Sequence, residues 1–218
     1  MECRLSSGKL IVLEGIDGAG KTSIARGLVT LLQQDGCTVL LTSEPSESSC
    51  GKRIHDIIRE GCVRASPEAE FLLFAADRAL HMREVVEPAL RRGTIVIADR
   101  MGDSSIAYQG YGRGVDLAMI DTINAWVMRD VKPDLTVYCM IDYATAQKRL
   151  RERVSGVSGY DREQVEFFRA VIQGYEARYA QRRDVMRIDA TLPVESLVHE
   201  VYHRVCALVG SDGQQHEL

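Results

Sequence analysis

The chain has 218 residues, of which 45% are hydrophobic and 27% are charged. It is long and apolar enough to bury a sizeable core, which excludes disordered and fibrous proteins. Its 27 basic and 31 acidic side chains leave a net charge of −4. This balance lacks the broad positive field that non-specific binding to DNA or RNA needs, so we expect no nucleic-acid polymer as a partner.

The cysteines and the N-terminal region bear on the compartment. The six cysteines form no C-x-x-C pair and do not lie in a loop-rich framework, which is typical of reduced thiols. The first apolar stretch, residues 10–13, is too short for a signal sequence or a membrane span. We therefore expect a cytoplasmic protein that does not enter a membrane.

Strand and helix patterns alternate along the whole chain. Short apolar runs rich in β-branched residues predict buried strands at residues 9–14, 38–43, 94–99, 135–141 and 185–188. Helical patterns lie at residues 22–34, 51–60, 67–92 with an interruption at Pro88, 117–129, 144–154, 162–182 and 194–209. This alternation predicts an α/β fold, a doubly wound five-stranded parallel sheet with helices on both faces. We expect a single domain over residues 1–218, with a frayed polar tail at residues 210–218.

A phosphate-binding motif follows the first predicted strand. The pattern G-x-x-x-x-G-K-[ST] is matched by Gly15, Ile16, Asp17, Gly18, Ala19, Gly20, Lys21 and Thr22. Glycines let backbone N–H groups turn inward around an anion, Lys21 adds a charge for the β and γ phosphates, and the Thr22 hydroxyl can ligate Mg²⁺. The alternative is a glycine-rich turn without a ligand. The strand before and the helix after the motif favour a nucleoside triphosphate site.

The loop alone does not identify the reaction, because GTPases, ATPases and nucleotide kinases share it. A GTPase would carry an N-K-x-D motif, and this sequence contains no Asn-Lys pair. A motor ATPase usually needs more domains than 218 residues allow. Phosphoryl transfer to a small molecule is therefore the leading hypothesis.

Two further patterns indicate a second substrate. Phe74 and Arg78 are four residues apart, so one helix face can present a ring for stacking on a base beside a guanidinium. The alternative is a core phenylalanine beside a solvated arginine. Asp99 and Arg100 end the third predicted strand, at the edge where such sheets bind ligands. Asp99 is suited to a water on Mg²⁺ and Arg100 to an acceptor phosphate, although they could also form a structural ion pair.

These motifs together resemble those of the thymidylate kinase (dTMP kinase) family. The resemblance is carried by residues 14–22, 43–45, 74–78 and 99–100 and by the run Ala-Tyr-Gln-Gly-Tyr-Gly-Arg-Gly at residues 107–114, in family order over about residues 9–209. It implies transfer of the γ-phosphoryl group of ATP to dTMP, dependence on Mg²⁺ and a homodimer. Thymine specificity comes from the resemblance and not from composition or spacing.

The resemblance also implies roles for residues that match the motifs. Asp17 would accept a hydrogen bond from the sugar 3′-hydroxyl, and Arg100 would hold the acceptor phosphate. The base would be contacted by Phe74 through stacking, by Arg78 and Gln109, and by Ser105 near thymine N3. Tyr108 would crowd the 2′ carbon and so disfavour ribonucleotides.

A basic cluster before a glycine-containing segment predicts a lid at about residues 144–162. Its cations are Lys148, Arg149, Arg151 and Arg153. Phosphoryl transfer needs cations around spreading negative charge, although the cluster could also be a solvated face. The variable positions of the phosphate loop hold no arginine, which resembles the family form that carries its catalytic arginine in the lid. Arg153 is the first candidate and Arg149 the second.

One position departs from the family pattern. The family commonly has an arginine before Glu-Pro at the end of the second strand, and here that residue is Ser43. Either Arg53 or Arg100 compensates for the missing charge, or the acceptor site is weak or retuned. We expect compensation. A kinase for another nucleoside monophosphate or a deoxynucleoside, and an ATP-binding switch without transfer, remain alternatives.

Overall fold

The computed structural model describes residues 8–63, 65–129, 131–153 and 162–213. Its centre is a five-stranded sheet with the order β2-β3-β1-β4-β5, in which every pairing is parallel. The strands are β1 (Lys9–Glu14), β2 (Val39–Ser43), β3 (Ile95–Asp99), β4 (Leu135–Met140) and β5 (Val185–Asp189). The predicted α/β fold class is confirmed, and the strand bounds agree with expectation to within one residue.

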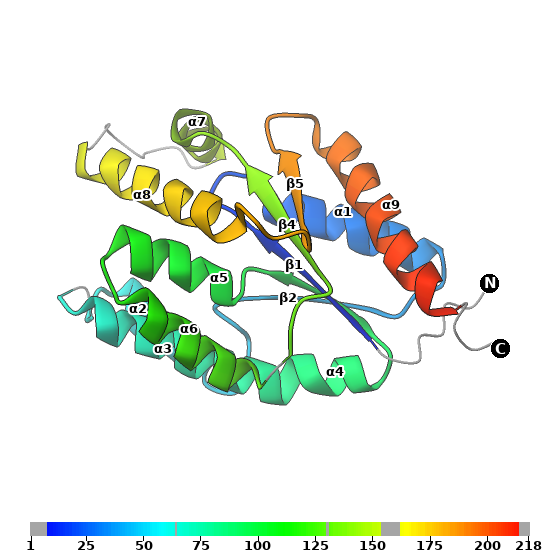
Figure 1. Cartoon of the computed structure of the whole chain (residues 1–218), viewed down its shortest axis with the longest axis horizontal. Coiled ribbons are helices and arrows are strands. Elements are labelled where there is room, and N and C mark those ends of the chain that lie inside the picture. The colour runs from blue at the N-terminus through cyan, green and yellow to red at the C-terminus, as the bar shows by residue number, and fades with distance from the viewer. Residues whose placement is uncertain (1–7, 64, 130, 154–161, 214–218) are drawn as a thin grey trace.

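Helices cover both faces of this sheet (Figure 1). On one face α1 (Lys21–Gln34) packs beside α9 (Val194–Gly213), over a core that includes Ile11, Leu13 and Val137. The opposite face carries the segment α3 (Pro67–His81), η1 (Met82–Val86) and α4 (Glu87–Arg91). The remaining helices are α2 (Gly51–Arg59), α5 (Gly102–Ser105), η2 (Ile106–Gly112), α6 (Leu117–Met128), α7 (Tyr143–Arg153) and α8 (Arg162–Tyr179).

The structure has no break in the helix at Pro88, where the sequence predicted an interruption. The backbone stays helical through α3, η1 and α4, and η1 is a π-helical turn that ends two residues before Pro88. Proline has no N–H for the bond to the fourth residue before it, and a wider turn at this point accommodates the missing donor. Gly93, with φ 76°, then ends the segment in a left-handed conformation, which glycine adopts readily at the end of a helix.

Two other expectations are corrected by the structure. The last helix was expected to end at residue 209, whereas α9 continues to Gly213. Residues 102–112 are helical, as α5 and the π-helical η2, whereas the sequence predicted no element there. Across the described ranges, no helix is both long and apolar enough to cross a membrane.

Candidate active site

The phosphate loop joins the end of β1 to the start of α1. Gly18 and Gly20 have φ of 88° and 85°, a backbone region that side chains strongly disfavour. A Cβ at Gly18 would also lie 2.4 Å from the carbonyl oxygen of Ala146. The loop therefore needs these glycines, and it places the N-terminus of α1 at the floor of the site, where backbone N–H groups favour an anion.

Lys21 lies folded into this loop. Its side chain is buried, and Nζ donates a hydrogen bond to the carbonyl oxygen of Ile16 at 3.1 Å. Burial, followed by the nearby charge of Arg100, lowers the pKa of Lys21 to about 8. An anion bound in the loop would restore the preference of this amine for its charged form.

Thr22 and Asp99 bring two oxygen ligands together. Thr22 Oγ1 donates to Asp99 Oδ2 at 2.6 Å, although the residues come from α1 and from the end of β3. Both line a cavity of about 280 Å³ with Lys21, Ser43 and Arg100. A hydroxyl beside a carboxylate suits Mg²⁺, which prefers oxygen ligands and keeps several waters. Within the described ranges, no cluster of three or more His, Cys, Asp or Glu residues could hold a metal ion.

Arg100 occupies the junction between this cavity and a second one. Its φ is 75°, which is rare for a residue with a side chain. Nη2 donates to Asp17 Oδ1 at 2.6 Å and to Tyr108 Oη at 3.1 Å. Desolvation in the loop opposes ionisation of Asp17, but the charges of Arg100 and Lys21 outweigh it and lower the pKa of this carboxyl. Burial raises the pKa of Tyr108 to about 12, so its hydroxyl stays protonated.

The second cavity has a volume of about 410 Å³ and adjoins the first. Asp17, Glu44 and Arg100 line both cavities. The residues that line only the second include the predicted Phe74, Arg78, Ser105, Tyr108 and Gln109, and also His55, Ile58 and Arg59 from α2. The structure therefore brings together the residues that the resemblance assigned to dTMP, namely Asp17, Phe74, Arg78, Arg100, Ser105, Tyr108 and Gln109.

Phe74 and Arg78 both face this cavity from α3, but their environments differ. Phe74 is partly exposed, whereas Arg78 is buried, so the alternative of a solvated arginine is excluded. Arg78 Nε donates to Glu44 Oε2 at 2.8 Å and Nη1 donates to Asn124 Oδ1 at 2.6 Å. These bonds, and a third from Nη2 to Ser105 Oγ at 3.1 Å, leave the guanidinium little freedom to reorient.

Glu44 and Ser104 are site residues for which the sequence predicted no role. Glu44 pairs with Arg78 and lies 3.2 Å from His81 Nδ1. The position of Glu44 in the Ser43-Glu44-Pro45 motif was the one feature of the sequence that could have indicated a role in the site. No local pattern indicated Ser104, because two of its side-chain partners, Glu14 and Tyr175, come from distant parts of the chain.

Arg53 and Arg100 were the two candidates to compensate for the missing charge at Ser43. Arg53 is exposed and lines neither cavity, so of the two candidates to compensate for Ser43 the structure brings only Arg100 to the site.

Arg149 Nη1 donates to the carbonyl oxygen of Ala190 at 2.7 Å, which ties α7 to the turn after β5. Arg153 ends α7, and its side chain lies outside the described residues, as do residues 154–161 of the lid predicted at about residues 144–162.

Comparisons with known proteins identify the family. A thymidylate kinase family model matches residues 13–201. A thymidylate kinase of Halothermothrix orenii is 42% identical over 200 residues, covering 91% of this chain and 96% of the relative. One of Pelotomaculum thermopropionicum is 40% identical, covering 88% and 89%, and one of Nitrosospira multiformis is 37% identical, covering 92% and 98%. The family predicted from the sequence motifs is thereby confirmed: the chain belongs to the thymidylate kinase family.

Proposed function

We propose that this protein transfers the γ-phosphoryl group of ATP to dTMP and so forms dTDP. One observation carries the proposal: the phosphate-loop cavity and the acceptor cavity share Asp17, Glu44 and Arg100, so a donor and an acceptor phosphate would meet at one arginine. Catalysis of phosphoryl transfer depends on such positioning and on charge stabilisation more than on covalent chemistry. Family membership supports the same reaction.

The donor side would hold the phosphates of ATP. The loop N–H groups from Gly15 to Thr22 and the charge of Lys21 are the binding groups. Thr22 and Asp99 would hold Mg²⁺, Thr22 directly and Asp99 through a water, which agrees with their contact of 2.6 Å. When bound, the ion neutralises charge on the phosphate oxygens.

The acceptor side would hold dTMP in a single orientation. Phe74 stacks on thymine, Ser105 and Gln109 bond its edge, and the fixed guanidinium of Arg78 orients it. Tyr108 leaves no room for a 2′-hydroxyl, and a buried hydroxyl without a partner gives strong discrimination. Asp17 accepts from the 3′-hydroxyl, and Arg100 holds the phosphate.

The lid would supply further positive charge during transfer. Arg153 at the end of α7 is the proposed catalytic arginine, because the phosphate loop itself contains none. Arg149 is the second candidate, although its bond to Ala190 gives it a structural use as well.

A coupled assay of ADP release tests the proposed function. ATP and Mg²⁺ are supplied with dTMP, dUMP, UMP, CMP, AMP, GMP or thymidine in parallel. We expect dTMP to give the highest kcat/KM. Higher turnover of another acceptor would favour a retuned monophosphate or deoxynucleoside kinase, and ATP binding without acceptor-dependent ADP release would favour a switch.

We further propose a cytoplasmic homodimer that acts on nucleotides and not on nucleic-acid polymers. The exposed apolar side chains Leu117, Met119 and Trp126 on α6 support the dimer, since Trp126 is 79% exposed. Five unbridged cysteines in the described residues support a reducing compartment. Light scattering should give twice the chain mass, and Trp126→Asp should shift the protein toward the monomer.

A further inference from the structure

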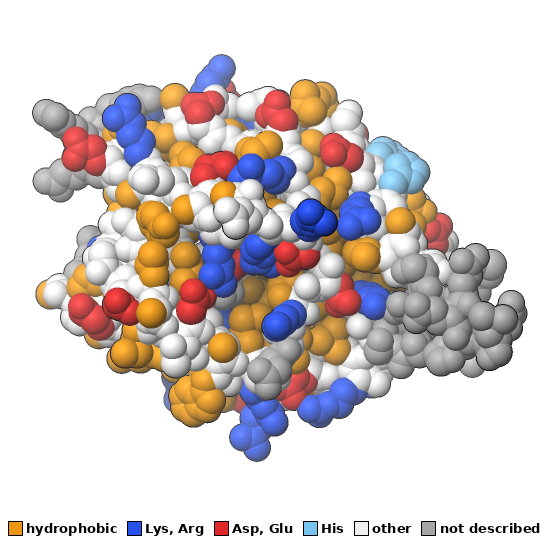
Figure 2. Space-filling model, viewed as in Figure 1, with side chains coloured by type: hydrophobic (Ala, Val, Ile, Leu, Met, Phe, Trp, Pro, Cys, Tyr) orange, Lys and Arg blue, Asp and Glu red, His pale blue; other side chains and the backbone are white. Residues whose placement is uncertain are grey.

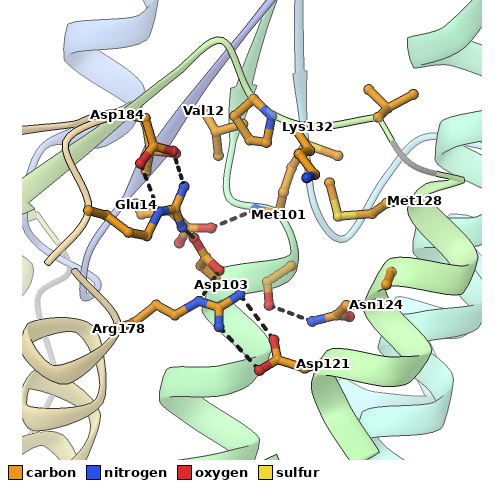
Figure 3. A pocket seen from close by; sticks show the side chains of 16 residues that line it. Val12, Glu14, Met101, Asp103, Asp121, Asn124, Met128, Lys132, Arg178 and Asp184 are labelled. Atoms are coloured by element: carbon orange, nitrogen blue, oxygen red, sulfur yellow. Dashed lines mark hydrogen bonds and ion pairs between the residues drawn. The ribbon is translucent and has the colours of Figure 1, made fainter. Parts of the chain in front are cut away.

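Glu14, the last residue of β1, is a fully buried carboxylate that none of the proposed steps uses. It lies at the inner end of a cavity of about 430 Å³, shown in Figure 3, which is also lined by Asp103, Arg178 and Arg182. Figure 2 shows that one face of the molecule is hollowed near its middle, with basic and acidic side chains gathered around the hollow. Two sets of hydrogen bonds connect Glu14 to Arg100.

The first connection reaches the backbone beside Arg100. Glu14 Oε1 accepts a hydrogen bond from the N–H of Met101 at 2.9 Å (Figure 3). On the other side, the N–H of Arg100 donates to the carbonyl oxygen of Leu13 at 2.9 Å. The N–H groups of Arg100 and of the next residue, Met101, are thus both bonded to the end of β1, and these bonds hold the left-handed backbone conformation of Arg100. A residue with a side chain keeps this conformation only when its surroundings hold it there, because the conformation is strained.

The second connection reaches the guanidinium through two hydroxyl groups. Arg100 Nη1 donates to Ser104 Oγ at 3.0 Å and to Tyr175 Oη at 3.2 Å. Those hydroxyls in turn donate to Glu14 Oε2, at 2.6 Å from Ser104 and 2.9 Å from Tyr175. The same guanidinium uses Nη2 for Asp17 and Tyr108. Glu14 therefore orients Nη1 of Arg100 through the hydroxyl groups that lie between them.

We propose that Glu14 is a positioning residue for phosphoryl transfer, which fixes Arg100 at its backbone through Met101 and at its guanidinium through Ser104 and Tyr175. Its carboxylate accepts bonds on both oxygens, as no neutral side chain of the same size can do. The inference rests on the proposed role of Arg100 at the acceptor phosphate. It predicts that a substitution of Glu14 weakens the binding of ligands that carry this phosphate and does not change the binding of other ligands.

The groups around Glu14 determine what a substitution changes. The charged and titratable neighbours are Arg100 after β3, Asp103 on α5, Tyr175 and Tyr179 on α8, and Cys139 on β4. In Glu14→Gln, the amide NH₂ must face either the N–H of Met101 or the two hydroxyls, all of which now donate to Glu14. One connection to Arg100 is therefore lost while the volume of the side chain is kept.

The test compares dTMP with thymidine, which shares the base and sugar but has no phosphate. At pH 8, where Glu14 is mostly ionised, we expect KM for dTMP to rise about tenfold in Glu14→Gln, with KM for ATP and the inhibition constant of thymidine changed less than about twofold. Arg100→Ala should show the same selectivity more strongly. Glu87→Gln is the matched control, a buried carboxylate on α4 outside both site cavities, and should change none of these constants.

A second variant keeps the proposal testable if Glu14→Gln does not fold. Ser104→Ala/Tyr175→Phe removes both hydroxyls and leaves Glu14 in place, and we expect the same selective rise in KM for dTMP. Adding Glu14→Gln to this double variant should raise KM by much less than the product of the separate effects. Equal weakening of dTMP and thymidine, or no change in either, would overturn the positioning role. Absence of dTMP turnover in the unaltered protein would instead overturn the proposed function.

Discussion

Nη2 of Arg100 lies 2.6 Å from Oδ1 of Asp17, although 83 positions separate the two residues in the chain. The pair links the phosphate loop to the end of β3 at the boundary of the two cavities. An acceptor phosphate would compete with Asp17 for this guanidinium, which frees the carboxylate for a sugar hydroxyl. The ion pair thus keeps both groups in place before the substrate arrives.

Lys21→Ala should remove most of the dTMP kinase activity without unfolding the protein. Desolvation disfavours the buried lysine charge, as its lowered pKa shows, so its loss costs the fold little. The phosphates of ATP lose their point charge. Turnover and circular dichroism spectra measured on the same samples check this, and unchanged turnover would contradict the assignment of the phosphate loop.

Phe74→Ala should raise KM for dTMP about tenfold, with little change for ATP, because stacking of a base on an aromatic ring contributes about 1–3 kcal/mol. Phe71→Leu on the same helix is the control, since Phe71 is buried in the core. It should lower Tm without selectivity between the substrates. If Phe74→Ala weakens both substrates equally, Phe74 is a structural residue.

Arg153→Ala should lower kcat by about 100-fold with little change in either KM, because a cation that acts only in the transition state does not affect ground-state binding. Arg149→Ala is the comparison and should chiefly lower Tm through loss of its bond to Ala190. If Arg149→Ala lowers kcat and Arg153→Ala does not, Arg149 is the catalytic arginine. If neither variant lowers kcat, the proposed role of the lid is wrong.

Ser43→Arg should change KM for dTMP by less than tenfold, because Arg100 lines the acceptor cavity and is proposed to hold the acceptor phosphate. Arg53→Ala should have no effect, since Arg53 lines neither cavity, whereas Arg59→Ala should raise this KM. A large gain from Ser43→Arg would indicate instead that the native acceptor site is weak or retuned.

The stability of the protein should depend on the ionisation of Glu14. Burial, and then the negative charge of Asp103, raises the pKa of Glu14 from 4.5 to about 7. The folded protein therefore holds this proton more tightly than the unfolded chain does. The contribution of Glu14 to the free energy of unfolding is complete below pH 4.5 and is lost as the pH rises through about 7, by about 3 kcal/mol in total.

Urea unfolding at pH 5, 6, 7 and 8 measures this dependence. Glu14→Gln cannot ionise at that position, so its stability relative to the unaltered protein should increase across the series. Parallel pH curves for the two proteins would contradict the raised pKa. Together with the expected loss in dTMP binding, the increase would show a residue that lowers stability in order to orient the site.

Local patterns in the sequence were sufficient for much of the architecture. The strand at residues 9–14 was predicted with the bounds that β1 has, because a short apolar run between polar residues is typical of a strand that a parallel sheet buries on both faces. The phosphate loop is equally local, since its glycines, lysine and threonine act on neighbouring backbone. Phe74 and Arg78 reach one cavity because helical spacing alone aligns them.

Only the tertiary structure decided how the arginines are used. Arg78 looks the same in sequence whether it is solvated or buried, and its pairing with Glu44 and Asn124 depends on how three separate segments pack. Glu14 and Tyr175 are 161 positions apart, yet the Tyr175 hydroxyl bonds both Glu14 and the guanidinium of Arg100. Residue type and spacing specify which groups a short segment can offer, whereas the partner of a buried charge is chosen by the packing that removes it from water.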